Sequence, residues 1–169
     1  DKTLVNKAFK EGTESRNFYE KVYDMDFNNP YVLQQGALYL AYKRKFNLAF
    51  EWIDKAITQT NNKYFSIRNS HAIILFEANI NNPNDNLDIR RQLDNSMEIL
   101  EKCFNADKRK VFHAVRYAEQ SIEYLNRYYD KKALSYVETA KLWLRSEYQQ
   151  RNWDRELQNL LNKIEKIKL

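Results

Sequence analysis

The chain has 169 residues, of which 43% are hydrophobic and 14% aromatic, but only two are glycine and two proline. This length is sufficient for one domain with a sizeable core, and the scarcity of turn residues argues against a β-rich fold. The formal net charge is +5, with 28 basic residues interspersed among 23 acidic ones. No apolar run approaches the roughly 18–20 residues of a membrane span. The single cysteine excludes an intramolecular disulfide, which fits a reducing cytoplasm.

Apolar residues recur at spacings of three and four almost throughout, which predicts amphipathic helices. In chain order, the predicted helices are 3–10, 13–26, 30–44, 46–59, 64–80, 87–105, 109–128, 131–150 and 152–167. Pro30 suits the first turn of its helix, and the stretch "NNPNDN" at 81–86 consists of turn residues. The fold class is therefore all-α, and the short loops predict that neighbouring helices are antiparallel.

Small residues recur at intervals of twelve and then seven positions. Two triplets keep these intervals: Ala37, Ala49, Ala56 and Ser121, Ala133, Ala140. A third triplet, Ala72, Ser96 and Cys103, has its first interval doubled by an insertion at 81–92. Two antiparallel helices need small side chains where their backbones approach closely, so each triplet predicts one packed helix pair.

This pattern resembles the tetratricopeptide repeat, a helix–turn–helix unit of about 34 residues. The resemblance implies a single domain that forms a short right-handed solenoid of antiparallel helix pairs. Its units would be a half unit at 13–29, then 30–64, 65–113 with the insertion 81–92, and 114–150. The chain departs from the repeat at Gly36 and Gln120, where a large residue is usual, and it lacks the proline after the second helix. The alternative is a helical bundle without repeats, in which the alanine spacing arises by chance.

The last predicted helix, 152–167, caps the open end of this stack. Its apolar face carries Trp153, Leu157, Leu160, Leu161 and Ile164. A solenoid needs such a terminal helix with a polar outer side. The alternative role for this helix is dimerisation.

A second resemblance concerns "NNPYVLQQGALYLAYKRKFNLAFEWIDKAI" and the later stretch "FSIRNSHAIILFEANI". Both are similar to the C-terminal repeat arms of large prokaryotic proteins with a STAND-type nucleotide-binding or sirtuin-like module upstream, many of which act in antiphage defence. The resemblance implies that this chain is the sensing arm of a longer cytoplasmic bacterial protein, from which it has been excised.

Signatures of catalysis are missing from the sequence. Two glycines cannot build a phosphate-binding G-x-x-x-x-G-K-[ST] or G-x-G-x-x-G loop. Helical di-iron sites require an acidic residue three or four positions before each histidine ligand. Neither His71 nor His113 has one. Neither histidine has the arginine spacing of the helical ribonucleases called HEPN, and Cys103 occupies a packing position. We therefore expect no enzymatic activity, no cofactor and no metal site.

The function that we expect is binding of a protein or peptide, of unknown identity, in the concave groove of the solenoid, with no membrane association. The expected groove residues are Tyr31, Gln34, Leu38, Tyr42, Asn69, Ile73, Glu77, Ile122 and Asn126. The alternative is a nucleic-acid-binding repeat. Its phosphate contacts would come from two basic runs: Lys43, Arg44, Lys45 and Lys108, Arg109, Lys110.

Overall fold

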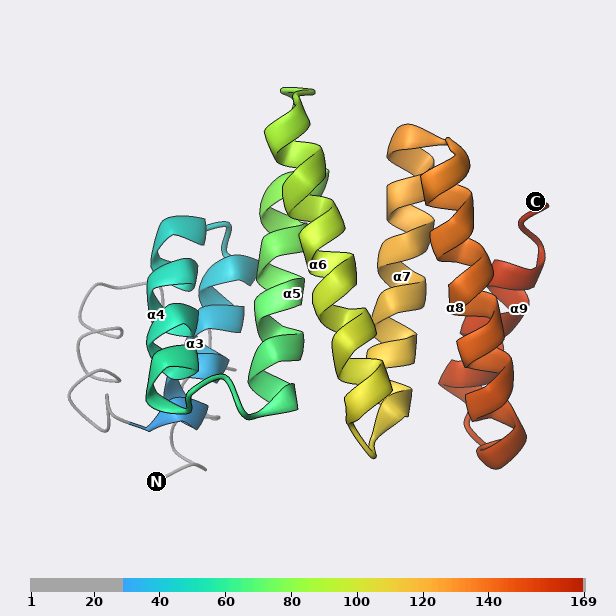
Figure 1. The fold of residues 1–169 in the computed structure, drawn as a ribbon, viewed down its shortest axis with the longest axis horizontal. Helices are drawn as coiled ribbons and strands as arrows, with labels where there is room; N and C mark the ends of the chain where they lie inside the picture. Colours follow the sequence, from blue (N-terminus) through green and yellow to red (C-terminus); the bar gives the residue numbers. More distant parts are fainter. Residues whose placement is uncertain (1–28, 169) are drawn as a thin grey trace. The chain divides into compact units, whose positions relative to one another are not determined.

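The computed structural model describes residues 29–168 and contains only helices in this range. They are α3 (Pro30–Tyr42), α4 (Phe46–Gln59), α5 (Phe65–Ile80), α6 (Leu87–Ala106), α7 (Lys110–Tyr128), α8 (Lys131–Gln150) and α9 (Arg155–Glu165) (Figure 1). The chain divides into two compact units, Asp1–Ala78 and Asn79–Leu169. None of the described helices combines the length and the apolar composition needed to cross a membrane. The helices predicted at 3–10 and 13–26 lie outside the described residues.

The all-α prediction is confirmed, and every helix expected after residue 29 is present. The main differences lie at helix ends. The first described helix stops at Tyr42 rather than at 44, because Arg44 adopts a left-handed backbone conformation with φ of 64°. The last helix begins at Arg155 rather than at 152, after Asp154 accepts a hydrogen bond from the N–H of Leu157 (3.1 Å).

Side chains rather than glycines set most helix boundaries. Asn29, Asn86 and Asp130 each accept a hydrogen bond from a main-chain N–H in the first turn of the helix that follows. Such caps satisfy donors that the helix itself leaves without a partner. At the other end, Tyr129 takes a left-handed conformation with φ of 39° after α7, a role that glycine usually fills.

The small residues of the repeat pattern are completely buried. The residues with 0% exposure include all three triplets: Ala37, Ala49, Ala56, Ala72, Ser96, Cys103, Ser121, Ala133 and Ala140. Helices α3 and α4 pack as a pair, as do α7 and α8, and both pairs run antiparallel, as expected (Figure 1). The pattern therefore marks buried packing positions, as the sequence analysis predicts.

The insertion at 81–92 is shared between a loop and the first turns of α6. Arg127 of α7 holds this loop through three main-chain oxygens. Its guanidinium donates to Asn79 (3.0 Å), Ile80 (2.7 Å) and Asn84 (3.2 Å). The first two oxygens belong to the last turn of α5, where carbonyls lack a partner within the helix. One side chain thus both ends α5 and fixes the connection to α6.

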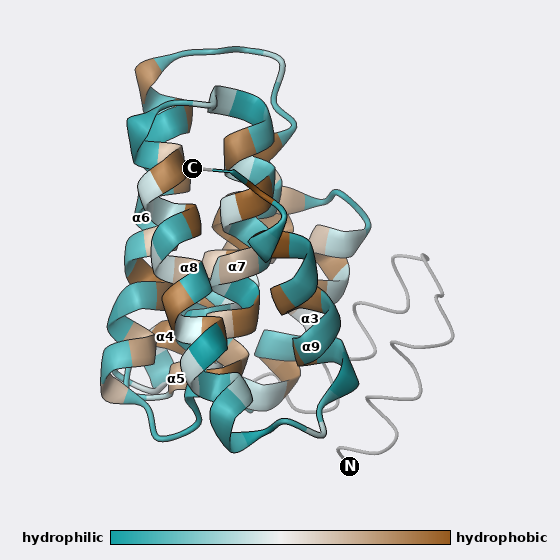
Figure 2. Ribbon diagram, turned by 90° about the vertical axis from the view of Figure 1, so that its right-hand side faces the viewer, coloured by the Kyte–Doolittle hydropathy of each residue, from teal (hydrophilic) through white to brown (hydrophobic). Residues whose placement is uncertain are grey.

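Helix α9 packs on α7 and α8 in the second unit, as expected of a terminal helix. Leu157 and Ile164 are 1% and 0% exposed, and the outer side of α9 is mostly hydrophilic (Figure 2). Arg145 of α8 makes a two-point ion pair with Glu165 at 2.5 and 2.7 Å. The prediction is wrong for Trp153, which precedes the helix and is 74% exposed.

Replacing one of the buried small residues should destabilise the fold. We expect Ala140→Leu to lower the free energy of unfolding by about 1–3 kcal/mol or more, because the added atoms force α8 away from its partner. The matched control is Glu138→Leu, which adds the same side chain at an exposed position of α8. Urea unfolding followed by circular dichroism measures both, and equal stability of the two variants would contradict the packing role of Ala140.

Candidate functional site

In the first unit, α3 and α5 are neighbours. The side-chain amide of Gln34 on α3 donates to the main-chain oxygen of Ser66 (3.1 Å) and to the hydroxyl of Ser70 (2.9 Å) on α5. Beyond the end of α3, the guanidinium of Arg44 lies 3.9 Å from the carboxylate of Glu77. The sequence predicts α3 and α5 as the first helices of successive pairs, and their contact is compatible with a helical repeat.

Six of the residues expected in a groove lie on these two helices with accessible side chains. Tyr42 is 79% exposed and the other five are half-buried: Tyr31, Leu38, Asn69, Ile73 and Glu77. We call these six residues the α3–α5 face.

Helix geometry places both halves of this face on the same side. With about 100° of rotation per residue, the α3 residues lie to one side of Gln34. On α5, Asn69 and Ile73 lie in the opposite rotational sense from Ser66 and Ser70, while Glu77 lies at the same angle as these two serines. The two helices run in the same direction (Figure 1), so opposite rotations turn both stripes toward the same side. Tyr42 and Ile73 are the large apolar members of this surface.

Three of the expected groove residues do not belong to this face. Gln34 is only 9% exposed, and its amide nitrogen is used by Ser66 and Ser70, so it ties two helices together. Ile122 is also 9% exposed and lies in the core of the second unit. Asn126 is exposed on α7, again in the second unit. Helical spacing predicts that all three lie on the groove-facing stripe of their helices. It does not show which positions on such a stripe become buried against another helix, as Gln34 and Ile122 do.

The first basic run is largely occupied by side chains of its own unit. The ammonium of Lys43 lies 5.8 Å from the ring centre of Tyr39 and 5.7 Å from that of Tyr42. The guanidinium of Arg44 lies 4.7 Å from the ring centre of Phe46, in addition to its ion pair with Glu77. Cation–π contacts of this kind hold a charge near the protein surface.

The second basic run borders a hollow at one end of the second unit. Lys108 and Lys110 line a hollow of about 400 Å³, together with Trp143, Glu147 and Arg151 of α8 and its C-terminal cap. All three residues of the run are exposed. We call this feature the basic hollow.

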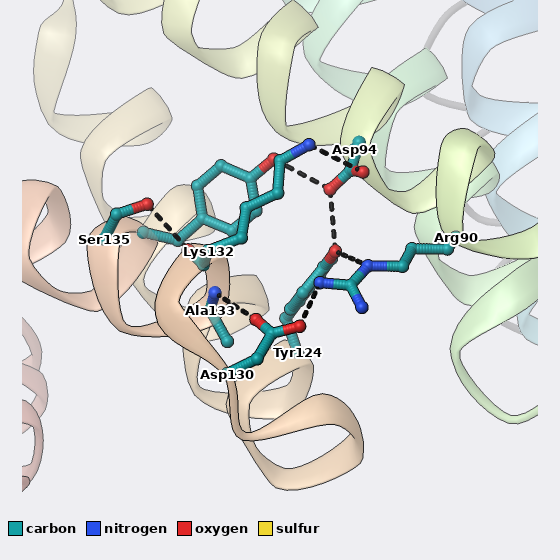
Figure 3. Close-up of polar contacts among 8 residues, drawn as sticks. Arg90, Asp94, Tyr124, Asp130, Lys132, Ala133 and Ser135 are labelled. Atoms are coloured by element: carbon teal, nitrogen blue, oxygen red, sulfur yellow. Dashed lines mark hydrogen bonds and ion pairs between the residues drawn. The ribbon is translucent and has the colours of Figure 1, made fainter. Parts of the chain in front are cut away.

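A polar network that the sequence analysis did not anticipate joins α6, α7 and α8 (Figure 3). Asp94 accepts hydrogen bonds from the hydroxyls of Tyr124 (2.7 Å) and Tyr136 (2.8 Å) and from the ammonium of Lys132 (2.9 Å). Arg90 donates to the hydroxyl of Tyr124 (3.0 Å) and forms an ion pair with Asp130. No periodic pattern points to this network, because its members come from three helices.

The surroundings of the network shift the pKa of several members. Burial, and then the hydrogen bond to Asp94, raise the pKa of both Tyr124 and Tyr136. The hydrogen bond from the N–H of Ala133, followed by the contacts of Arg90, lowers the pKa of Asp130. At neutral pH the tyrosines are therefore hydrogen-bond donors and Asp130 is ionised.

Two further hollows, of about 520 and 670 Å³, flank this network around Leu87, which is 88% exposed. Their charges are already paired: Arg91 with Asp88, Arg90 with Asp130 and Lys132 with Asp94. A network whose groups satisfy one another rigidifies the fold and leaves little for a ligand. We therefore assign this region a structural role.

The histidines and the cysteine have structural surroundings. His113 is 2% exposed, and its Nε2 lies 2.7 Å from Asp107. Burial would raise the pKa of Asp107, but the hydrogen bonds with His113 and with the N–H of Arg109 outweigh it and lower the pKa. Burial lowers the pKa of His71, with Asp54 opposing the shift, and Cys103 is buried. Within residues 29–168, no three histidine, cysteine or acidic side chains are arranged to hold a metal ion.

No protein family, no curated protein and no solved structure was found that matches this chain. The all-helical fold rests on the structure itself, and the packed helix pairs are compatible with a helical repeat.

The first prediction for this region concerns the network. Asp94→Asn keeps the size of the side chain but removes the charge that accepts three donors. We expect it to lower the free energy of unfolding by about 1–3 kcal/mol, because Lys132 loses its counter-charge and one of the two acceptor oxygens becomes an amide donor. In the control Glu98→Gln, which breaks an exposed ion pair with Lys102, the change should stay below about 1 kcal/mol. Urea unfolding distinguishes them, and an equal small effect would contradict the role of Asp94.

The second prediction concerns pH. Because the pKa of Asp130 is lower in the folded protein, its ionised form stabilises the fold above the ordinary Asp pKa of about 3.9, and this contribution is lost as pH falls through the folded-state value. Asp130→Asn retains a capping oxygen without the titration. We expect the wild type to be more stable than the variant at about pH 7 and the difference to shrink as pH falls below the ordinary Asp pKa of about 3.9. Chemical unfolding across this range measures the difference, and a constant gap would rule out the linkage.

Proposed function

We propose that this chain is a non-enzymatic helical-repeat module that binds a protein or peptide through the α3–α5 face. The observation that carries the proposal is the position of the first helices of two successive pairs. Gln34 holds α3 directly against α5, and five of the six accessible residues expected to bind a partner line the same side of both helices.

The chemistry of the face suits a peptide segment. Tyr42 and Tyr31 offer large side chains that are apolar in the body and polar at the tip, a type enriched at interfaces. Leu38 and Ile73 add apolar surface. On α5, the amide of Asn69 lies one turn before Ile73 and the carboxylate of Glu77 lies one turn after it. A mixture of apolar anchors and amide groups is typical of sites that recognise both side chains and main chain.

The setting of this module is part of the same proposal. The repeat spacing supports a tetratricopeptide-like right-handed solenoid. The Asn-Pro helix start and the paired alanines support a sensing arm of a larger cytoplasmic bacterial protein, in signalling or defence. In such an arrangement the arm recognises a trigger, and the other domains of the protein carry out the response.

A second candidate function is binding of nucleic acid. It is favoured by one observation: Lys108 and Lys110 of the second basic run border the same hollow as Arg151. Cations gathered along one groove are a common arrangement for contacting the phosphates of single-stranded nucleic acid. The first basic run supports it less, since Lys43 and Arg44 are held by neighbouring side chains.

The double variant Tyr31→Ala/Tyr42→Ala tests the proposed face. In an affinity capture from a lysate of the source organism, with nuclease and at moderate salt, we expect the variant to lose a protein that the wild type retains. The control is Tyr64→Ala, which removes a tyrosine that is 60% exposed and lies off the face, just before α5. Circular dichroism confirms unchanged helix content in both variants.

Capture that is unchanged in the double variant, or lost equally in the control, would remove the α3–α5 face from consideration. Capture that depends on nuclease-sensitive material, or that disappears at moderate salt, would favour the nucleic-acid candidate, because phosphate contacts weaken steeply as salt rises.

A further inference from the structure

The basic hollow lies where the C-terminal ends of α6 and α8 meet the start of α7. Phe104 of α6 and Trp143 of α8 stack against each other in its wall, with ring centres 3.9 Å apart and planes at 9°. The volume of about 400 Å³ falls within the range of about 300–1,000 Å³ in which small ligands bind. Its wall contains both charged and aromatic groups.

Glu147 is the unusual member of this wall. The residue is only 7% exposed, and no hydrogen bond or ion pair of its carboxylate is found within the described part of the chain. The carboxylate oxygens are not among the fully buried side-chain atoms without a partner, so they open into the hollow that the residue lines. A ligand there with N–H donors would bond to these oxygens directly.

Three cations line the same hollow, and none of them pairs with Glu147. Lys108 and Arg151 are exposed at its edge, and Lys110 lies with its ammonium 5.2 Å from the ring centre of Phe104. Cations that share a small hollow attract an anion, and phosphate oxygens suit lysine and arginine. The hollow therefore combines an accessible hydrogen-bond acceptor with a positive edge that attracts an anion.

The aromatic rings restrict how a ligand can enter. One face of Phe104 is covered by Trp143 and its ring also carries the ammonium of Lys110. Trp143 additionally packs against Tyr117 at 4.5 Å. Stacking surfaces are thus already used within the protein, so a ligand is recognised by hydrogen bonds at its edge.

We propose that the basic hollow binds a nucleoside monophosphate, with guanine as the preferred base, either as a free nucleotide or as one unit of a single strand. Guanine carries two adjacent N–H donors on one edge, which match the two oxygens of the Glu147 carboxylate. The phosphate lies toward Lys108 and Arg151. Adenine and cytosine offer one amino group each, and uracil places acceptors beside its single N–H, so they bind less well. The proposal is independent of the α3–α5 face.

Calorimetric titration of the full chain at low salt tests this site, with GMP, AMP, CMP, UMP and inorganic phosphate as probes. We expect GMP to bind most tightly and UMP most weakly. Glu147→Gln should weaken GMP binding at least tenfold and leave inorganic phosphate unchanged, because only the base contacts residue 147. Glu138→Gln makes the same change at an exposed position of α8 and should have no effect. Lys108→Ala/Arg151→Ala should weaken every nucleotide to a similar degree.

Glu147→Gln keeps the size of the side chain and removes no hydrogen bond or ion pair within the described residues, so we expect it to fold, and thermal unfolding verifies this. Absence of nucleotide binding, or binding of inorganic phosphate as tight as that of GMP, would overturn the proposal. A further titration uses single-stranded RNA that contains guanine. Tight RNA binding that Glu147→Gln leaves unchanged would overturn the nucleotide site while supporting the second candidate function; RNA binding that Glu147→Gln weakens would support both.

Discussion

The close approach of paired helices at completely buried small side chains is the constraint on which the rest of this structure depends. With only two glycines in the chain, alanine, serine and cysteine provide the space where helix backbones meet. Ala37, Ala49 and Ala56 do so in the first unit, and Ser121, Ala133 and Ala140 do so in the second. Because protein interiors are packed as densely as organic crystals, these positions determine the rotation of each helix about its axis. They thereby also determine which side chains face outward.

Polar side chains then select which helices become neighbours. Gln34 joins α3 to α5, Arg127 joins α7 to the end of α5 and its loop, and Asp94 joins α6 to α7 and α8. Hydrophobic packing is not directional, whereas a buried amide or carboxylate must find partners at defined positions. These contacts convert apolar helices of similar length into one particular arrangement within each unit.

The two surfaces that we propose for binding differ in chemistry because one lies along the sides of helices and the other lies at helix ends. The α3–α5 face consists of the outward sides of two first helices, so it is extended and contains tyrosine, isoleucine and asparagine. The basic hollow forms where helix ends meet, so it is small, charged and enclosed. A peptide with apolar anchors suits the first, and a compact anion with hydrogen-bond donors suits the second.

The sequence by itself determined the all-α class, the seven described helices to within a few residues, and the small residues that become buried. All of these depend on local periodicity and capping, which neighbouring residues encode. Only the tertiary structure decided which positions on an amphipathic stripe stay accessible, as the contrast between buried Gln34 and exposed Tyr42 shows. It also decided that Asp94 accepts hydrogen bonds from α7 and α8 and that the carboxylate of Glu147 opens into a hollow. Such properties arise from residues far apart in the chain that come together through packing, and helical spacing does not record them.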